Sequence, residues 1–186
     1  MARIPYVDVD SAPEPVRMAL ASAPKSNLLN LLAHAETCFV PRSGFSKALL
    51  TQLKLAPRAR ELVILRVAVL TPGADYGWLQ HEQIAREVGL SEQEIESART
   101  GKGLDSDAEL LIQFTDEVVH DVRASDETFA AIADRFSPRE IIELLLVIGQ
   151  YMALGRIMAT TQVDLEMLDG SAALESFRQA SIATNR

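Results

Sequence analysis

The sequence is short of the residues that form disulfides or bind metals. Its 186 residues include one cysteine, Cys38, so an intramolecular disulfide is excluded. We expect Cys38 to be a small buried or half-buried residue rather than a reactive thiol, because no neighbouring group favours its thiolate. The three histidines lie far apart and form no H-x-x-x-H or H-E-x-x-H pair. The sequence therefore indicates neither a metal site nor a bound cofactor.

Positive charge is also scarce. Lysine and arginine total 18 against 26 aspartates and glutamates, which gives a net charge of −8. An acidic chain without a basic stripe is a poor candidate for binding nucleic acid or an anionic membrane. We expect no apolar run near the length of a bilayer span, and the start MARIPYVDVD lacks the hydrophobic core of a signal peptide. The sequence thus predicts no nucleic-acid partner, no membrane association and a cytoplasmic location.

Strand patterns are absent, and helical patterns replace them. No alternating apolar and polar run of any length occurs, and the length suits one domain with a sizeable core. We predict an all-α fold in a single domain over residues 1–186. Capping boxes are expected at Ser11 with Glu14 and at Ser91 with Glu94. Pro41 is expected to break one helix, SNLLNLLAHAET, before the next begins.

Two later segments complete the helical pattern. Ser106 is expected to start a helix whose apolar face includes Leu110, Phe114 and, at its end, Val122. The stretch from Pro138 onward is the longest and most apolar in the chain. Its glycines at positions 149 and 155 favour close approach of another helix, with a bend as the alternative.

The segment PRARELVILRVAVLTPGADYGWLQHEQIAREVGL, residues 57–90, predicts two antiparallel helices joined by a tight turn. Helices with so short a link pack side by side, so Glu61 on the first can approach His81 on the second. A neutral imidazole exchanges protons near pH 7, and a carboxylate partner orients it. We therefore predict an acid/base pair. A histidine bonded at a helix interface and a glutamate ion-paired in the first helical turn remain the alternatives.

This block resembles the carboxymuconolactone decarboxylase family within the AhpD-like superfamily of alkylhydroperoxidases. The similarity rests on an ordered set of residues, which extends loosely over most of the chain: Pro57, Arg58, Arg60, Glu61, Leu62, Leu65, Arg66, Tyr76, Trp78, His81, Ala85 and Gly89. The resemblance implies an AhpD-like helical bundle with internally duplicated helices. It also implies a homo-oligomer, a trimer or a hexamer, with active sites near the subunit contacts.

An internal echo agrees with the implied duplication. Leu55, Pro57 and Arg58 recur as Phe136, Pro138 and Arg139, each time before an apolar helix. Chance repetition of a helix that starts with Pro-Arg is the alternative.

Two positions depart from the superfamily pattern. The thiol branch carries a C-x-x-C-x-x-x-H motif, whose cysteine positions are here Ala74 and Gly77. The decarboxylase-like branch often has a carboxylate directly after the tyrosine, and that position is again Gly77. Peroxide reduction by a dithiol is therefore not expected, and a second acidic group is missing one helical turn before His81.

The resemblance also implies roles for individual residues. His81 would be the acid/base, Glu61 its partner, and Tyr76 a hydrogen-bond donor to the substrate. Arg60, with Arg66 as the alternative, would anchor a substrate carboxylate, and Trp78 and His34 would contact the substrate. Packing is the alternative for the two aromatic residues, a salt bridge for the arginines, and core placement for His34 and for Tyr151.

Three functions stay open at this stage. The first is a cofactor-independent decarboxylase-like enzyme that acts on a small carboxylated lactone or a related unsaturated acid. The second is an alkylhydroperoxidase-like antioxidant protein, and the third is a non-catalytic helical oligomer that binds a small molecule or a protein. Fold similarity alone does not choose among them.

Overall fold

The computed structural model describes residues 1–73, 75–103 and 105–166, and within these ranges the chain is all-α without a strand. A 3₁₀ turn at Val9–Ser11 precedes the α-helices, which are α1 (Glu14–Ala21), α2 (Asn27–Leu32), α3 (Glu36–Thr51), α4 (Pro57–Leu70), α5 (Asp75–Glu87), α6 (Glu92–Thr100), α7 (Ser106–Asp121), α8 (Asp126–Arg135) and α9 (Pro138–Thr161). The predicted all-α fold is confirmed.

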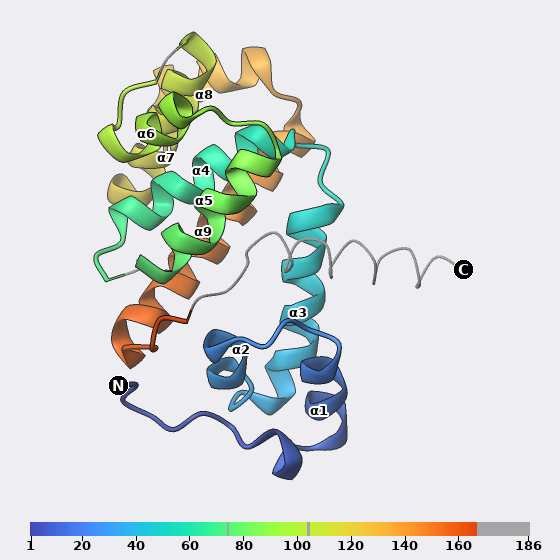
Figure 1. The fold of residues 1–186 in the computed structure, drawn as a ribbon. Helices are drawn as coiled ribbons and strands as arrows, with labels where there is room; N and C mark the ends of the chain where they lie inside the picture. The colour runs from blue at the N-terminus through green and yellow to red at the C-terminus, as the bar shows by residue number, and fades with distance from the viewer. Residues whose placement is uncertain (74, 104, 167–186) are drawn as a thin grey trace.

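The arrangement centres on α4, which packs against α5, α6, α7 and α9 (Figure 1). The helices α1 and α2 lie at one end of the molecule, and α3 and α9 extend from that end towards the other helices. Every residue of α4 from Arg60 to Val67 is buried. A helix that is buried on all sides has no face turned to solvent, and its charged residues in this stretch, Arg60, Glu61 and Arg66, are paired within the protein.

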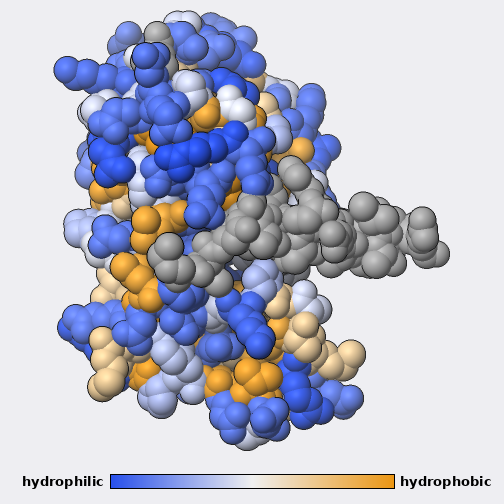
Figure 2. Space-filling model, viewed as in Figure 1, coloured by the Kyte–Doolittle hydropathy of each residue, from blue (hydrophilic) through white to orange (hydrophobic). Residues whose placement is uncertain are grey.

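A second, smaller core lies at the end formed by α1–α3. It is built from Val16, Leu32 and Phe39, and Leu154 and Ile157 of α9 pack against it. The two cores are therefore joined through α9. Figure 2 shows hydrophilic residues over most of the upper part of one face, whereas hydrophobic ones gather lower down, towards α1–α3.

One of the two predicted capping boxes is present in the structure. Ser91 and Glu94 form the predicted box at the start of α6. The box predicted at Ser11 is wrong: α1 begins after Pro13 without a side-chain cap, and the Ser11 hydroxyl donates to the carbonyl of Asp8. The 3₁₀ turn takes up Ser11, so the serine lies too far from α1 to cap it.

The predicted break at Pro41 is also wrong. The chain breaks earlier, after α2 ends at Leu32, and α3 then runs through Pro41. Pro41 and Thr37, whose carbonyl loses its helical partner at the proline, are both exposed. Water can therefore replace the missing hydrogen bond, and the proline is tolerated. Cys38 lies on this first part of α3 and is exposed, so its predicted burial is wrong too.

The prediction for Val122 is wrong, and the prediction for the two glycines of α9 holds for one of them. Val122 does not belong to the apolar face of α7, because it follows the end of that helix with φ 71° and is 87% exposed. Gly155 does allow a close approach, since a Cβ there would lie 2.6 Å from Thr71 Cγ2 at the end of α4. Gly149 faces open space instead.

The apolar stretch of α9 reaches the length of a bilayer span. By length and composition it could cross a membrane, with a mean hydropathy of 1.6 over its most apolar 18 residues, of which 39% are buried in the protein. The expectation of no such run is therefore wrong. Core helices pass the same test, and α9 packs against α3, α4, α7 and α8.

Candidate active site

Glu61 and His81 are in direct contact across the α4–α5 interface. Glu61 Oε2 lies 2.7 Å from His81 Nδ1, Glu61 is fully buried and His81 is 8% exposed. Because the carboxylate can only accept a hydrogen bond, the Nδ1–H of His81 donates. Among the described residues, no hydrogen bond occupies the opposite ring nitrogen, Nε2.

Arg60 holds the other carboxylate oxygen of Glu61. Its Nε donates to Glu61 Oε1 over 2.7 Å, and its Nη1 donates to the carbonyl of Leu50 over 2.5 Å. Burial alone raises the pKa of Glu61, but the charges and hydrogen bonds of His81 and Arg60 outweigh it and hold that pKa below its ordinary value. Glu61 is therefore an ionised carboxylate at neutral pH, saturated by two partners.

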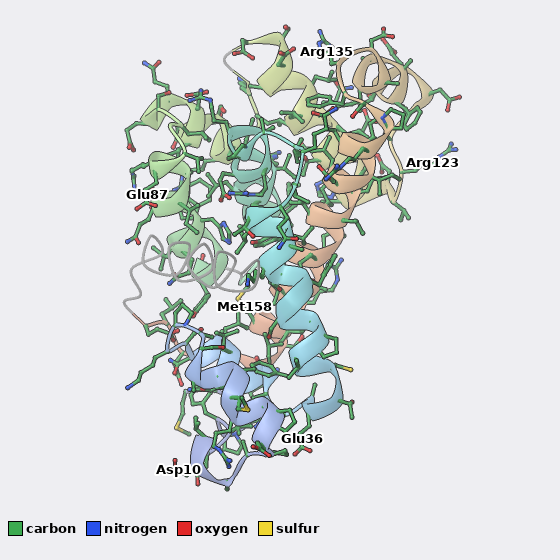
Figure 3. All side chains as sticks on the ribbon, turned by 90° about the vertical axis from the view of Figure 1, so that its right-hand side faces the viewer. Asp10, Glu36, Glu87, Arg123, Arg135 and Met158 are labelled. Carbon is green, nitrogen blue, oxygen red and sulfur yellow. The ribbon has the colours of Figure 1, made fainter. Side chains whose placement is uncertain are left out.

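A cavity of about 150 Å³ lies beside this pair. Most of its wall is apolar, and its lining comes from α2, α3, α5, α9 and the segment before α2: Pro24, Ser26, Leu28, Leu29, Leu32, Arg42, Ser46, Leu49, Leu50, Tyr76, Gly77, Gln80, His81, Ile84, Gln150, Tyr151, Leu154 and Met158. Figure 3 shows Met158 at the level where α1–α3 meet the upper helices. An apolar cavity with a few polar groups is the usual form of a small-molecule site.

Tyr151 of α9 packs edge-on against His81. Their ring centroids are 4.8 Å apart with an interplanar angle of 89°. Burial, followed by the charge of Glu61, raises the pKa of Tyr151, so its hydroxyl stays protonated and can donate. Within the described part of the chain, no hydrogen bond engages that hydroxyl. Its predicted core placement is therefore incomplete, because Tyr151 also lines the cavity.

Tyr76 lines the same cavity, but its hydroxyl is already engaged. It donates to Glu166 Oε1 and lies 2.8 Å from Ser26 Oγ. Because a tyrosine has one O–H, the serine donates to it. Burial and the Glu166 carboxylate both raise the pKa of Tyr76. Its position agrees with the predicted site, whereas its only proton is committed to Glu166.

Trp78 and His34 lie outside the cavity lining. Trp78 is 9% exposed in the main core, and the Arg99 guanidinium carbon lies 4.1 Å from its ring centroid. His34 is exposed just after α2, with Nε2 2.7 Å from the carbonyl oxygen of Pro5. The structure therefore gives each a packing or surface contact, and it does not bring either to the site.

The two arginines considered as anchors are both paired inside the protein. Arg60 is held by Glu61 and Leu50, and Arg66 donates to both carboxylate oxygens of Asp116 over 2.5 and 2.7 Å. Neither lines the cavity. The salt-bridge alternative therefore describes their observed contacts.

Two comparisons with known proteins find similarities. The family model described as "Carboxymuconolactone decarboxylase family" matches residues 42–110, which include both members of the buried pair. A solved structure from Agrobacterium tumefaciens, a protein of unknown function named there as a candidate antioxidant defence protein AhpD, has a TM-score of 0.60 and 20% sequence identity. It covers 90% of this chain and 100% of its own. Residues 42–110 are therefore similar to the carboxymuconolactone decarboxylase family, and the fold of the chain is similar to that of the AhpD-named structure. No curated protein sequence matches it significantly.

The superfamily's cysteine positions can now be compared with this site. Gly77 lines the cavity, and a Cβ there would meet Met158 Cε at 3.6 Å, an ordinary contact. Ala74, at the other cysteine position, lies outside the described residues. Cys38 is exposed on α3 and is absent from the cavity lining. No group of three or more potential metal ligands occurs within the described ranges.

Sequence reasoning missed most of the cavity wall, including its arginine, Arg42. It was assigned to a helix break after Pro41, where no face can be defined. In the continuous α3 it lies one turn before Ser46 and two turns before Leu49, and all three line the cavity. A helix drawn through Pro41 would have shown this common face.

Proposed function

We propose that the protein is a cofactor-independent acid/base enzyme of the carboxymuconolactone decarboxylase type, acting on a small carboxylated lactone or a related unsaturated acid. The observation that carries this proposal is the 2.7 Å contact between Glu61 and His81 at the wall of an apolar cavity. The carboxylate occupies Nδ1, so Nε2 is the nitrogen available to a ligand.

The chemistry follows from this arrangement. When a carboxylated unsaturated lactone loses CO₂, the C–C bond to the carboxyl group breaks and its electron pair delocalises towards the conjugated carbonyl. A protonated His81 then gives its Nε2 proton to carbon, and Glu61 stabilises the imidazolium before that step. Solvent returns the proton to His81. A proton shift within an unsaturated acid would use the same group, first as a base and then as an acid.

Tyr151 suits the role of donor to the developing oxyanion better than Tyr76. The Tyr151 hydroxyl has no partner among the described residues and lies on the ring packed against His81. The Tyr76 proton is engaged by Glu166. A donor that is already placed and uncommitted stabilises developing charge without reorganisation.

The alternative functions have less support. A dithiol peroxidase needs two adjacent thiols near the histidine, and Gly77 occupies one of those positions. A non-catalytic binding protein would need the cavity but gives no reason for a buried carboxylate behind the histidine.

The direct test is a turnover screen of small carboxylated lactones and unsaturated acids with wild type, His81→Asn and His120→Asn. His120 is an exposed histidine on α7 and serves as the matched control. We expect His81→Asn to lower kcat by about 10²–10⁴-fold and His120→Asn to leave it unchanged. Equal activity in all three proteins would overturn the proposal, and cysteine-dependent peroxide turnover would favour the antioxidant function.

We infer further that the protein is a homo-oligomer, with a trimer or a hexamer as the expected state. Support comes from the outer face of α9, where Ile142 is 57% exposed, Leu145 37% and Leu146 44%. These residues share one side of the helix with exposed Gly149 and Ala153. Apolar helix faces of this kind are typically covered by another subunit.

A further inference from the structure

Arg42 is the one lysine or arginine among the described residues that line the cavity. Its Nη2 is buried and has no hydrogen-bond partner among the described residues, and no ion pair within them involves its guanidinium. Burial lowers the pKa of Arg42, but an arginine keeps its charge at neutral pH. A buried cationic nitrogen without a partner is costly and calls for an explanation.

The surroundings of Arg42 favour an anion. Among the described residues, no aspartate or glutamate lines the cavity. Glu61 lies behind His81 and is paired with Arg60, and Glu166 accepts hydrogen bonds from the Tyr76 hydroxyl and the Asn27 backbone N–H. Neither carboxylate forms an ion pair with Arg42. Arg42 and Tyr151 line the same cavity and interact electrostatically.

The rest of the wall limits the ligand to a small and mostly apolar body. Leucines from α2, α3 and α9, with Ile84 and Met158, make most of the lining. A cavity of about 150 Å³ is the size that holds a single six-membered ring in an engineered protein cavity. One cation beside such a wall matches one negative charge, because a second would be buried unpaired.

We propose that Arg42 anchors the ligand, and that this ligand is a small monocarboxylate with an apolar body of about one ring. The guanidinium fork binds the carboxylate, and the body lies along the leucine wall towards His81 Nε2. This proposal rests on the proposed function for His81 as the reacting group. Because the one carboxylate stays bound to Arg42, the proposal fits the proton shift within an unsaturated acid rather than the loss of CO₂. It assigns the anchoring role to a residue other than Arg60 and Arg66.

The test measures binding rather than turnover, with benzoate as the charged probe and benzamide as its neutral counterpart. Calorimetry or ligand-observed NMR at pH 7 would compare wild type, Arg42→Gln, Arg42→Lys and Lys47→Gln. Lys47 is the matched control, because it is a cation on the same helix outside the cavity lining. We expect Arg42→Gln to weaken benzoate binding by about ten- to a hundredfold.

The other variants sharpen the result. Benzamide binding should be unchanged in Arg42→Gln, Lys47→Gln should bind both probes as wild type does, and Arg42→Lys should recover part of the benzoate affinity. Equal benzoate affinity in Arg42→Gln and wild type would overturn the proposal. So would a parallel loss of both probes, which would indicate a damaged cavity rather than a lost anchor.

A second measurement separates anchoring from a structural role. Arg42→Gln removes a half-buried cation whose Nη2 has no partner among the described residues, so the melting temperature without ligand should stay the same or rise. A clear fall would show that Arg42 supports the fold and would contradict the proposal. Benzoate binding does not require the acid/base pair, so it should persist in His81→Asn. A failure of the anchor and a failure of the proposed chemistry are thereby distinguishable.

Discussion

Glu61 and His81 are joined at 2.7 Å, and the contact is one link in a chain of buried hydrogen bonds that crosses three helices. Arg60 connects Glu61 to the carbonyl of Leu50, so the chain runs from α3 through α4 to α5. Each group in it is held by its neighbours. The arrangement therefore orients one imidazole nitrogen towards the cavity and leaves little freedom in the carboxylate behind it.

The first prediction concerns Glu61→Gln and the dependence of stability on pH. The pKa of Glu61 in the folded protein lies below its ordinary value of 4.5, so the folded state favours its charged form. Its contribution is therefore present above the unfolded-state pKa and is lost as the pH falls through the folded-state pKa. At neutral pH, Glu61→Gln should lower the free energy of unfolding by about 3–5 kcal/mol, because Arg60 loses its buried partner.

Urea unfolding of both proteins between neutral and acidic pH measures this. The difference in unfolding free energy between wild type and Glu61→Gln should shrink as the pH falls below about 4.5. A difference that stays constant with pH would show that Glu61 is not an ionised partner of this network.

The second prediction contrasts two glycines in helices. Gly77→Ala should stabilise the protein by about 0.5–1 kcal/mol, because its Cβ would make only ordinary contacts and alanine is the better helix former. Gly155→Ala should cost about 1–3 kcal/mol, since its Cβ would lie 2.6 Å from Thr71 Cγ2. Thr71 cannot rotate away freely, because its hydroxyl donates to the carbonyl of Val67.

Thermal or urea unfolding compares the two variants directly. The two substitutions should change the free energy of unfolding in opposite directions. If both substitutions destabilised the protein equally, the close approach of α9 to the end of α4 would not explain Gly155.

The third prediction separates the two tyrosines of the cavity. Tyr151→Phe should leave stability within about 0.5 kcal/mol of wild type, because the hydroxyl bonds no described residue, and should lower turnover. Tyr76→Phe should cost about 1–3 kcal/mol, because its hydroxyl bonds Ser26 and Glu166. Steady-state kinetics and unfolding curves for both variants measure this, and the reverse pattern would restore Tyr76 as the donor.

The fourth prediction tests the outer face of α9. Leu146→Glu places a charge in the middle of the apolar face and should dissociate the oligomer into smaller species. Phe129→Glu on α8 is the control, because Phe129 is a similarly exposed apolar residue, at 49%, on another helix. Light scattering coupled to size exclusion reports the mass of each. A monomeric wild type would contradict the inferred oligomer.

The sequence predicted the fold class and the central contact for one physical reason. Helical spacing and a short turn determine which faces of two neighbouring helices meet, and Glu61 and His81 lie on those faces. Helical spacing and turn length do not predict contacts between helices that are distant in sequence. Arg42 and Tyr151 come to the cavity from α3 and α9, and only the tertiary packing brings them together.

A prediction from local sequence also failed at Pro41, because this position is exposed to solvent. Pro41 was expected to end a helix, yet the surface location of α3 lets water replace the lost hydrogen bond. That single error concealed the face carrying Arg42. Tyr76 was placed in the site by its position, but its partner, Glu166, lies 90 residues away and left no local signal.

The most direct test of the central claim is the protonation pattern of the His81 ring, read from ¹⁵N–¹H correlation NMR in wild type and Glu61→Gln. In its neutral form, wild-type His81 should carry its proton on Nδ1, because the Glu61 carboxylate only accepts, and should leave Nε2 unprotonated towards the cavity. Glu61→Gln should shift that preference. A neutral His81 protonated on Nε2 in wild type, or one unaffected by Glu61→Gln, would contradict the acid/base site.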